Sequence, residues 1–371
     1  MKGRSRNGRP FCFFSLNLPL FIHLVMELMM HETVNGLTAV FLFFVLFCAN
    51  STLFAAGAEV SEAHAEKPRI ALELGFKAGY RSDQLNWNIA RDFTGSQPNV
   101  LSELSWDDLE IYQVQFQPSL SVAGKMKSGF RYHLRGLFGW GDIFDGDNQD
   151  SDYAGDNRTL EFSRSNNAAD GGDVQDFSVG AGLEFFGRGE VWTFIPLLGY
   201  SYHEQNLQIT DGYQTVSEQA LADGFFGTGR INLPPLGPIV GLDSRYHSEW
   251  YGPWLGLELI FASAEKWNIT GTVEYHLIEY YGEADWNLRE DLQHPASFRH
   301  WAEGEGFSFT MGLLRNFNRS WSGTLNVNFQ KWHTDDGTDV TYLANGSTSG
   351  TLLNEVNWES FSLLAGVTRR F

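Results

Sequence analysis

The sequence predicts an all-β fold: a single transmembrane, antiparallel, up-and-down β-barrel of about ten long strands. Two observations predict this fold class. Apolar and polar residues alternate in segments spread along most of the chain, and short and long polar connections join these segments in turn. A period of two indicates a strand with two unlike faces. Short turns at one end and long loops at the other are typical of outer-membrane barrels.

Composition narrows the class of partner. Among 371 residues, 26 Lys and Arg face 45 Asp and Glu, which leaves a net charge of −19. Such a charge repels phosphate backbones, so we expect no nucleic-acid partner. Aromatic residues make up 15% of the chain, a content that excludes intrinsic disorder. The mean hydropathy of −0.25 alone indicates a water-soluble protein, but it averages two strand faces that meet different solvents.

The N-terminal segment has the features of an export signal. The run Leu37–Cys48 contains 12 residues, almost all apolar, which suits the hydrophobic region of a signal peptide and is too short to span a bilayer. We therefore predict a presequence over 1–65 and a mature barrel over 66–371, with the start and cleavage sites left open. Cys12 and Cys48 are the two cysteines, so the predicted mature barrel contains no disulfide.

Ten segments carry the alternation. In the first, the even positions from Ile70 to Tyr80 are apolar or aromatic, and the last ends at Phe371. These stretches are expected to exceed the roughly 9–11 residues that a tilted membrane strand needs. The ten predicted strands lie around 69–80, 112–120, 132–140, 177–185, 192–200, 255–261, 269–275, 307–313, 325–329 and 361–371.

The connections favour a barrel over a soluble β-sandwich, which also alternates. The predicted short turns are 125–129, 187–190, 263–266 and 316–320, and the predicted long polar loops are 142–172, 211–246, 286–300 and 335–350. Aromatic residues near strand ends are expected to form the interfacial girdles: Trp192, Trp254, Trp267, Tyr275 and Trp321. Charged residues on the opposite face are expected to fill the lumen as ion pairs: Arg69, Lys77, Arg131, His133, Arg135, Glu184, Glu258 and Glu274.

The C-terminal residue adds a further indication. Phe371 closes an alternating strand, and a terminal Phe resembles the signal by which outer-membrane barrels are recognised for assembly. The barrel assembly machinery is therefore an expected partner through Phe371. Arg369 departs from that pattern, because an aromatic or apolar residue is usual there.

Two short elements carry a family resemblance. Ser102-Glu103-Leu104-Ser105-Trp106 and Asp83-Gln84-Leu85-Asn86-Trp87 resemble an element near the first hairpin of the omptins, ten-stranded outer-membrane proteases. They also resemble the related Protochlamydia-type outer-membrane proteins. The resemblance covers 68–371 in order, by pattern more than by identity.

The resemblance implies a peptidase site at the barrel rim, built from an Asp-x-Asp pair and an Asp-x-His pair. Asp150 and Asp152, followed by Tyr153, match the first pair. Asp285 matches the second, but Asn287 stands where the His belongs. Asn is neutral and cannot act as a general base. The candidate catalytic residues are thus Asp150, Asp152 and Asp285, in a degenerate rim. His276, His294 and His300 are the nearby histidines that a rearrangement would have to use.

A simpler interpretation of the first pair remains open. Five Asp fall within the 11 residues from Asp142 to Asp152, so an Asp-x-Asp arises there by composition, and a solvated acidic loop is the competing interpretation. The same holds for the stretch 333–339. The first stretch lacks the central Gly and the terminal Glu of a calcium-binding EF-hand, and no metal or other cofactor is expected.

Three functions are compatible with the sequence. The first is a surface-exposed binding or structural barrel with a degenerate catalytic rim, and the second is an active omptin-like endopeptidase that cleaves at basic residues. The third is a narrow cation-preferring channel. A wide pore is not expected, because a barrel of about eight strands is filled by its side chains and ten strands are close to that number. The expected location is the outer membrane of a Gram-negative-type bacterium, with loops extracellular.

The expected partners are lipids and basic surfaces. Lipopolysaccharide is expected as a structural lipid, and the resemblance implies basic side chains on the barrel wall for it. Arg245, Lys266 and Arg315 are candidates that the sequence does not distinguish. Basic peptides or a host surface would suit the acidic rim, and the chain is expected to be a monomer.

Overall fold

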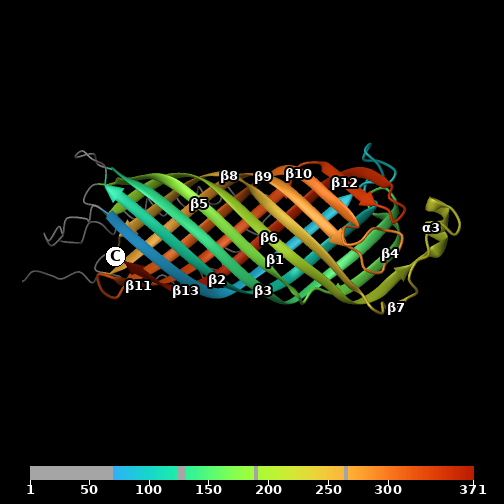
Figure 1. The fold of residues 1–371 in the computed structure, drawn as a ribbon, viewed down its shortest axis with the longest axis horizontal. Coiled ribbons are helices and arrows are strands. Elements are labelled where there is room, and N and C mark those ends of the chain that lie inside the picture. The colour runs from blue at the N-terminus through green and yellow to red at the C-terminus, as the bar shows by residue number, and fades with distance from the viewer. Residues whose placement is uncertain (1–69, 124–129, 188–190, 263–265) are drawn as a thin grey trace, which may run out of the picture. The chain divides into compact units, whose positions relative to one another are not determined.

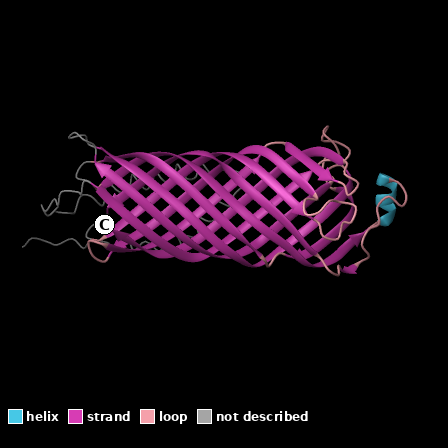
Figure 2. Cartoon of the chain, in the orientation of Figure 1, coloured by secondary structure: helices cyan, strands magenta, loops and turns pink. Residues whose placement is uncertain are grey.

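The computed structural model describes residues 70–123, 130–187, 191–262 and 266–371. The predicted presequence 1–65 and parts of the predicted short turns lie outside these residues. The described part is almost entirely β-strand, with one short helix (Figure 2). No helix within it is long and apolar enough to cross a membrane.

In the described residues, thirteen strands and one helix follow one another (Figure 1). They are β1 (Ile70–Ile89), β2 (Ser102–Ala123), β3 (Phe130–Gly155), β4 (Thr159–Ala168), β5 (Gly172–Phe186), β6 (Trp192–Ser217), α3 (Gln219–Phe226), β7 (Gly237–Pro238), β8 (Asp243–Ala262), β9 (Trp267–Asp285), β10 (Phe298–Asn316), β11 (Trp321–Thr334), β12 (Gly337–Tyr342) and β13 (Thr348–Arg370).

These strands close into one antiparallel barrel. The long strands pair in the order β1-β2-β3-β5-β6-β8-β9-β10-β11-β13, and β13 pairs back onto β1. Strands β4 and β5 both pair with β3 and β6 and share one place in the ring, as β11 and β12 do between β10 and β13. The ring therefore has about ten places, and the predicted fold class is confirmed. Each of the ten predicted segments lies in a different one of these places.

The predicted long loops are wrong in extent. Most of 142–172 is strand, because β3 continues to Gly155 and β4 begins at Thr159. Polar residues pair across these strands, as in the 2.7 Å hydrogen bond that Asn167 Nδ2 donates to Asn148 Oδ1. Backbone pairing needs no apolar side chain, so an acidic stretch can continue a ladder. The connections at this end, called here the long-connection end, are 90–101, 156–158, 218–242, 286–297 and 343–347.

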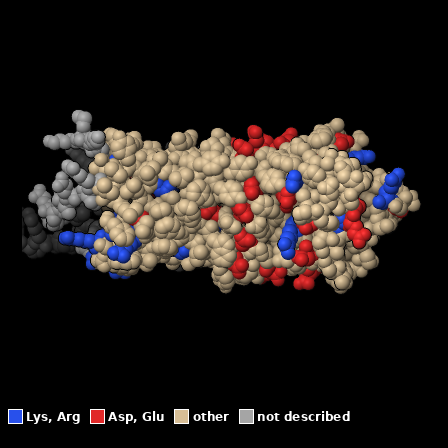
Figure 3. All heavy atoms as spheres, in the orientation of Figure 1, with Lys and Arg blue, Asp and Glu red and all other residues tan. Residues whose placement is uncertain are grey.

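The polarity of the two barrel faces reverses along the strands. On β1, Phe76 and Tyr80 are exposed on the outer wall, whereas Lys77 lines the lumen. Further along the same strand, Leu85 and Trp87 are buried inside, at 0% and 3% exposure. Asp and Glu accordingly gather over the half toward the long-connection end, and the other half shows a largely uncharged wall (Figure 3). The outer wall of the half near the long-connection end is therefore suited to contact with water, and the outer wall of the other half is suited to contact with lipid.

Most of the predicted girdle residues are on the outer wall, but one is not. Trp192, Trp267, Trp321 and Tyr275 are between 40% and 48% exposed. Trp254 is wrong as a girdle residue, because it is 1% exposed inside the lumen. Gly199 makes room for its indole, since a β-carbon there would lie 2.2 Å from the Trp254 ring.

Charged side chains fill the lumen beside Trp254, as predicted. The Arg135 guanidinium lies 4.9 Å from the centre of the Trp254 ring and is ion-paired with Glu258 and Glu274. Arg131 and His133 are ion-paired with Glu184. The predicted ion-paired networks are therefore present for these residues, while Arg69 lies outside the described part of the chain.

Candidate functional site

Asp150 and Asp152 lie in strand β3, near the long-connection end. Asp150 stands opposite Leu104 and Asp152 opposite Ser102 on β2. Leu104 is 2% exposed and belongs to the apolar core inside the barrel. Residues directly opposite each other in a ladder share a face, so both carboxyl groups face the lumen. The solvated-loop interpretation of this pair is wrong in its geometry.

The environment of the pair changes its protonation. Both residues lie beyond Trp140, the last large apolar side chain that β3 exposes on the outer wall. Burial, with the neighbouring Asp152 carboxylate, holds the pKa of Asp150 well above its ordinary value. Burial likewise raises the pKa of Asp152 to about 6. The two carboxyl groups therefore retain protons at pH values at which an isolated carboxyl is ionised.

A positive charge acts on this pair from another connection. Arg289 belongs to the 286–297 connection between β9 and β10, which occupy places in the ring opposite β3. Its charge lowers the pKa of Asp150 and of Asp152, against the effect of burial. The guanidinium is held by Asp291 through two 2.8 Å hydrogen bonds, which raise the pKa of Arg289.

Asp285 has a histidine partner, but not at the expected position. His294 Nδ1 lies 2.5 Å from Asp285 Oδ1, and the two side chains are 40% and 33% exposed. Asp285 stands opposite Arg245 on β8, whereas its neighbour Ala284 stands opposite the buried Tyr246. Since successive residues of a strand point to opposite faces, the Asp285–His294 pair lies on the outer side of the wall.

Asn287, at the position where the resemblance implies a histidine, holds the neighbouring connection in place. Its Nδ2 donates to the Gly241 carbonyl at 2.7 Å. Its Oδ1 accepts from the Asp243 backbone N–H at 3.0 Å and from Ser244 Oγ at 3.1 Å. The amide thus ties the beginning of β8 to the end of β9, and its hydrogen-bonding groups are engaged in doing so.

The other two candidate histidines, His300 and His276, have partners away from Asp285 and Asn287. His300 is buried between Tyr246 and Asp339, with Nδ1 2.9 Å from the Tyr246 hydroxyl and Nε2 3.2 Å from Asp339 Oδ1. His276 lies in the lumen, 3.0 Å from Ser201 Oγ. The structure therefore brings Asp150 to Asp152 and Asp285 to His294, but places the two pairs on opposite faces of the barrel wall.

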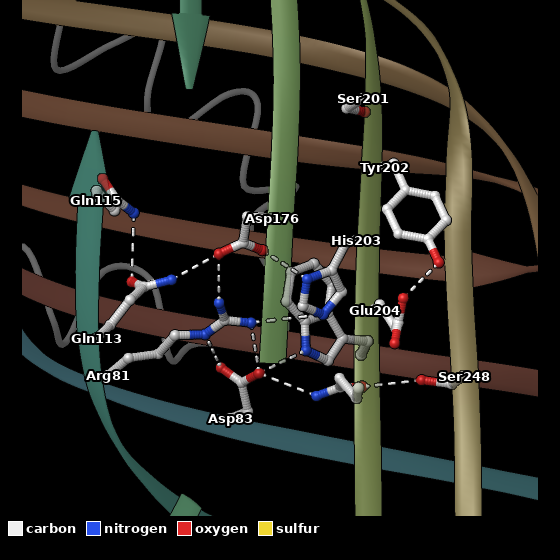
Figure 4. Close-up of polar contacts among 12 residues, drawn as sticks. Arg81, Asp83, Gln113, Gln115, Asp176, Ser201, Tyr202, His203, Glu204 and Ser248 are labelled. Carbon is white, nitrogen blue, oxygen red and sulfur yellow. Dashed lines mark hydrogen bonds and ion pairs between the residues drawn. The ribbon is translucent and has the colours of Figure 1, made fainter. Parts of the chain in front are cut away.

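A second polar group, which no sequence pattern indicated, lies inside the barrel (Figure 4). The Arg81 guanidinium makes 2.7 Å hydrogen bonds to both oxygens of Asp83 and a 2.9 Å bond to Asp176. His203 Nδ1 lies 2.6 Å from the other oxygen of Asp176. Arg81, Asp83 and His203 are each at most 2% exposed. We call these four residues the lumen network.

Neighbouring side chains complete the lumen network. Asp83 Oδ2 also accepts from Gln205 Nε2 at 3.0 Å and from the Trp358 indole N–H at 3.1 Å. Gln113 donates to Asp176 at 2.5 Å. The Trp358 ring stacks on His203, with ring centres 4.2 Å apart. Strands β6 and β13, which carry these two rings, occupy opposite places in the ring, so the lumen network spans the barrel.

Toward the long-connection end, aromatic side chains fill the lumen above this network. The rings of Trp106 on β2 and Tyr246 on β8 stack at 5.0 Å from opposite walls. Trp332 lies 4.9 Å from Trp358 and 6.1 Å from Trp250. All five of these aromatic residues are at most 2% exposed. We call this group the aromatic layer.

Toward the other end, the lumen is polar and hollow. A cavity of about 370 Å³ lies below the lumen network, lined by amides, hydroxyls and ion-paired charges, among them Lys77, Gln117, Arg135, Glu258 and Asn328. Within 70–371, apart from the three gaps in the description, no cluster of His, Asp or Glu has the arrangement of a metal site. The chemistry available at the rim is that of a carboxyl pair, Asp150 and Asp152, and a separate carboxylate–imidazole pair, Asp285 and His294.

Comparisons with known proteins agree with this architecture. The model of the family described as Protochlamydia outer membrane protein matches residues 75–371. Among solved structures, the outer membrane protease OmpT from Escherichia coli is similar with a TM-score of 0.61, over 81% of this chain and 97% of that chain, at 12% identity. At that identity the likeness shows the fold alone. No protein among the curated sequences matches this chain.

Other barrels match more weakly. The translocator domain of the autotransporter NalP from Neisseria meningitidis has a TM-score of 0.32 at 8% identity, covering 90% of this chain and 98% of that chain. The outer membrane protein OprG from Pseudomonas aeruginosa has a TM-score of 0.29 at 8% identity, covering 81% and 95%. Such low TM-scores carry no argument about function.

Proposed function

Because this chain belongs to the Protochlamydia outer membrane protein family and is an outer-membrane β-barrel, we propose that it is a surface-exposed binding or structural barrel with a degenerate catalytic rim. In this proposal the cell is of the Gram-negative type, and the long-connection end faces outward. Basic peptides or a host surface would bind its acidic wall, and lipopolysaccharide would surround it. Assembly would proceed through the C-terminal Phe371.

One observation carries the proposal: the Asp150–Asp152 pair and the Asp285–His294 pair lie on opposite faces of the wall. Hydrolysis by an activated water requires the base to lie within hydrogen-bond reach of the water that the carboxylates hold. Asp150 and Asp152 face the lumen, whereas His294 and Asp285 lie on the outer side. Loss of general-base catalysis removes roughly 10²–10⁴-fold of rate, so little peptidase activity is expected.

The side chains that fill the lumen argue against an open channel. Trp106 and Tyr246 meet from opposite walls, and the lumen network lies beneath them. An ion would have to displace buried aromatic rings and then an ion-paired guanidinium, and both steps are costly. A barrel of this kind is expected to be closed to ions.

A second candidate function is favoured by the Asp285–His294 pair. A histidine held by a carboxylate is the arrangement that general bases use, and the 2.5 Å distance shows that this chain has one despite Asn287. An active endopeptidase would require the 286–297 connection to turn His294 toward the lumen. We rank this candidate second because both ends of that connection are hydrogen-bonded to strands. Asn287 accepts from Asp243 and Ser244 of β8 at one end, and the Ser297 N–H donates to the Ala284 carbonyl of β9 at the other.

The test uses protein isolated from outer membranes with lipopolysaccharide present. A fluorogenic peptide with paired basic residues is assayed with the unmodified chain and with Asn287→His, His294→Ala and Asp150→Ala. Asp147→Ala serves as the matched control, because Asp147 is exposed on the same strand. We expect no cleavage above background in any sample, and no conductance steps in planar bilayers. Robust cleavage that Asp150→Ala and His294→Ala abolish, while Asp147→Ala does not, would establish the second candidate instead.

A further inference from the structure

A row of alternating aromatic and basic residues lies on the outer wall at the end opposite the long connections. It consists of Trp267, Arg315, Trp321, Arg369 and Phe371, from β9, β10, β11 and β13 and the residue after β13. We call it the basic–aromatic row. Trp267, Trp321 and Phe371 are 40%, 41% and 56% exposed. Lys and Arg are visible at this end of the barrel, near the C-terminus (Figures 1 and 3).

The register of the strands builds this row. Arg315 stands directly opposite Trp267, and its guanidinium lies 5.2 Å from the Trp267 ring centre. Arg369 stands opposite Trp321, at 5.5 Å from that ring, and also lies 4.5 Å from the Phe371 ring. Stacking on aromatic faces holds each guanidinium flat against the wall. The Arg369 that departs from the usual C-terminal pattern therefore has a defined structural place.

The two guanidinium charges of the row are not neutralised by any described carboxylate. Two arginines elsewhere on the barrel wall show the contrast, because each has a carboxylate partner: Arg370, one residue along, lies 2.7 Å from Glu73, and Arg299 lies 2.7 Å from Glu283. No described residue forms an ion pair with Arg315 or Arg369. Their N–H groups that face away from the rings remain available to an anion.

The surroundings of the row indicate which anion. Leu313, Leu325 and Val367 follow toward the middle of the barrel and are exposed at 39%, 45% and 45%, as expected for contact with acyl chains. Tryptophan at this level marks the boundary between hydrocarbon and headgroups. A guanidinium matches the geometry of a phosphate and binds it bidentately. Charge and apolar surface therefore coincide where a phospholipid places its phosphate and its acyl chains.

We propose that the basic–aromatic row is a binding site for the phosphate of an anionic phospholipid, in the leaflet at the short-turn end of the barrel. Arg315 and Arg369 hold the phosphate, and the aromatic rings hold the guanidinium groups in place. In the orientation proposed above this is the periplasmic leaflet, whereas lipopolysaccharide occupies the opposite one. In that orientation, Lys266 and Arg315, two of the three basic candidates for lipopolysaccharide, lie at the periplasmic end, and Arg245 lies at the long-connection end. The inference is independent of whether the rim cleaves peptides.

The test measures lipid binding by native mass spectrometry on protein isolated from outer membranes in mild detergent. The chain is titrated with dioleoyl-phosphatidylglycerol and, separately, with dioleoyl-phosphatidylcholine. We expect tighter binding of phosphatidylglycerol. Arg315→Gln should weaken it about fivefold and the double variant Arg315→Gln/Arg369→Gln about twentyfold, in line with the usual contribution of a basic residue near anionic lipid. Glycerol phosphate, which lacks acyl chains, should compete poorly.

Arg299→Gln is the matched control. Arg299 also stacks on an aromatic ring, 5.3 Å from Tyr342, but it is ion-paired and lies at the other end of the barrel. It should leave phosphatidylglycerol binding unchanged. Equal binding by the unmodified chain and by Arg315→Gln would overturn the proposal, as would equal affinity for the two lipids. Full competition by glycerol phosphate would show a soluble anion as the occupant and would overturn it as well. Arg315→Gln does not change the C-terminal strand. It therefore tests the proposal even if the double variant, which also changes Arg369, fails to assemble.

Discussion

His294 Nδ1 lies 2.5 Å from Asp285 Oδ1, although the histidine belongs to a connection and the aspartate ends a strand. Both side chains are at least one third exposed, and exposed ion pairs contribute little to stability. We therefore expect His294→Ala to lower the free energy of unfolding by at most about 1 kcal/mol. His300→Ala, which leaves the buried Asp339 and Tyr246 without a hydrogen-bond partner, should cost about 3 kcal/mol. Urea titrations of both variants measure this, and the reverse order would contradict the placement of the two pairs.

Asn287→Ala should loosen the connection between β6 and β8. The substitution removes hydrogen bonds to the Gly241 carbonyl, the Asp243 N–H and Ser244 Oγ, and each such bond contributes about 1 kcal/mol. Trypsin cleavage at Arg230, within the 218–242 connection, should become about tenfold faster on intact cells. Asn345→Ala, in the 343–347 connection, should leave the rate at Arg230 unchanged. An unaltered rate in Asn287→Ala would show that this amide does not hold the connection.

The carboxyl pair at the rim should make stability depend on pH. Burial raises the pKa of Asp152 to about 6 and holds that of Asp150 well above its ordinary value. The folded state therefore binds protons more tightly than the unfolded state, so the contribution of the pair is present below about pH 4 and is lost as the pH rises through about 6. The double variant Asp150→Asn/Asp152→Asn should therefore have a free energy of unfolding about 1 kcal/mol higher than that of the unmodified chain at pH 7.5, and nearly the same at pH 4. The value of about 1 kcal/mol includes a reduction for the partial exposure of the two side chains.

Unfolding by guanidinium chloride at the two pH values measures this difference. Asp147→Asn, on the same strand but exposed, is the control and should change stability little at either pH. A gain at pH 4 that is as large as the gain at pH 7.5 would contradict the argument.

Arg81→Met should be among the most destabilising single changes in the barrel. It leaves Asp83 and Asp176 buried without their guanidinium, and breaking a buried pair costs about 3–5 kcal/mol. Lys331→Met removes an exposed pair with Glu359 at 2.5 Å and should cost less than 1 kcal/mol. Denaturant midpoints of the two variants, compared at one pH, test the difference.

Removing most of the aromatic layer should lower the barrier that the lumen presents to ions. Trp250→Ala/Trp332→Ala/Trp358→Ala deletes three of the five buried rings of the aromatic layer, of which Trp332 also lines the hollow part of the lumen. Conductance steps should appear in planar bilayers where the unmodified chain shows none, at a stability cost of about 3–5 kcal/mol per indole. Trp192→Ala, which changes a residue on the outer wall, should show no conductance steps. Conductance in the unmodified chain would show that the aromatic layer does not close the lumen.

Much of the fold could be predicted because alternation is a local signal. Each predicted segment contains several residues of both faces, so the strands near the short turns were identified correctly. Alternation does not say which solvent each face meets. Leu85 and Trp87 alternate as clearly as Phe76 and Tyr80, but they point inward instead of outward. For the same reason, Trp254 looked like an interfacial residue.

The candidate site was less predictable, because its contacts join residues far apart in the chain. Arg81, Asp176 and His203 come from β1, β5 and β6, and no spacing connects them. His294 lies in a connection without periodic pattern, so its pairing with Asp285 had no signal beyond the residue type. The lumen-facing position of Asp150 depended on the extension of β3, which the acidic composition obscured.

The reversal of polarity along the strands also fixes the depth of the barrel in the membrane. On β6 the outward side chains change from Leu198 and Tyr200 to Glu204 and Asn206 within a few residues. A displacement by two residues, about 7 Å along a strand, would draw a ring of carboxylates into hydrocarbon or expose apolar wall to water. Both are costly. In a bilayer of the wrong thickness, the lipids next to this protein should therefore deform while the barrel keeps its position.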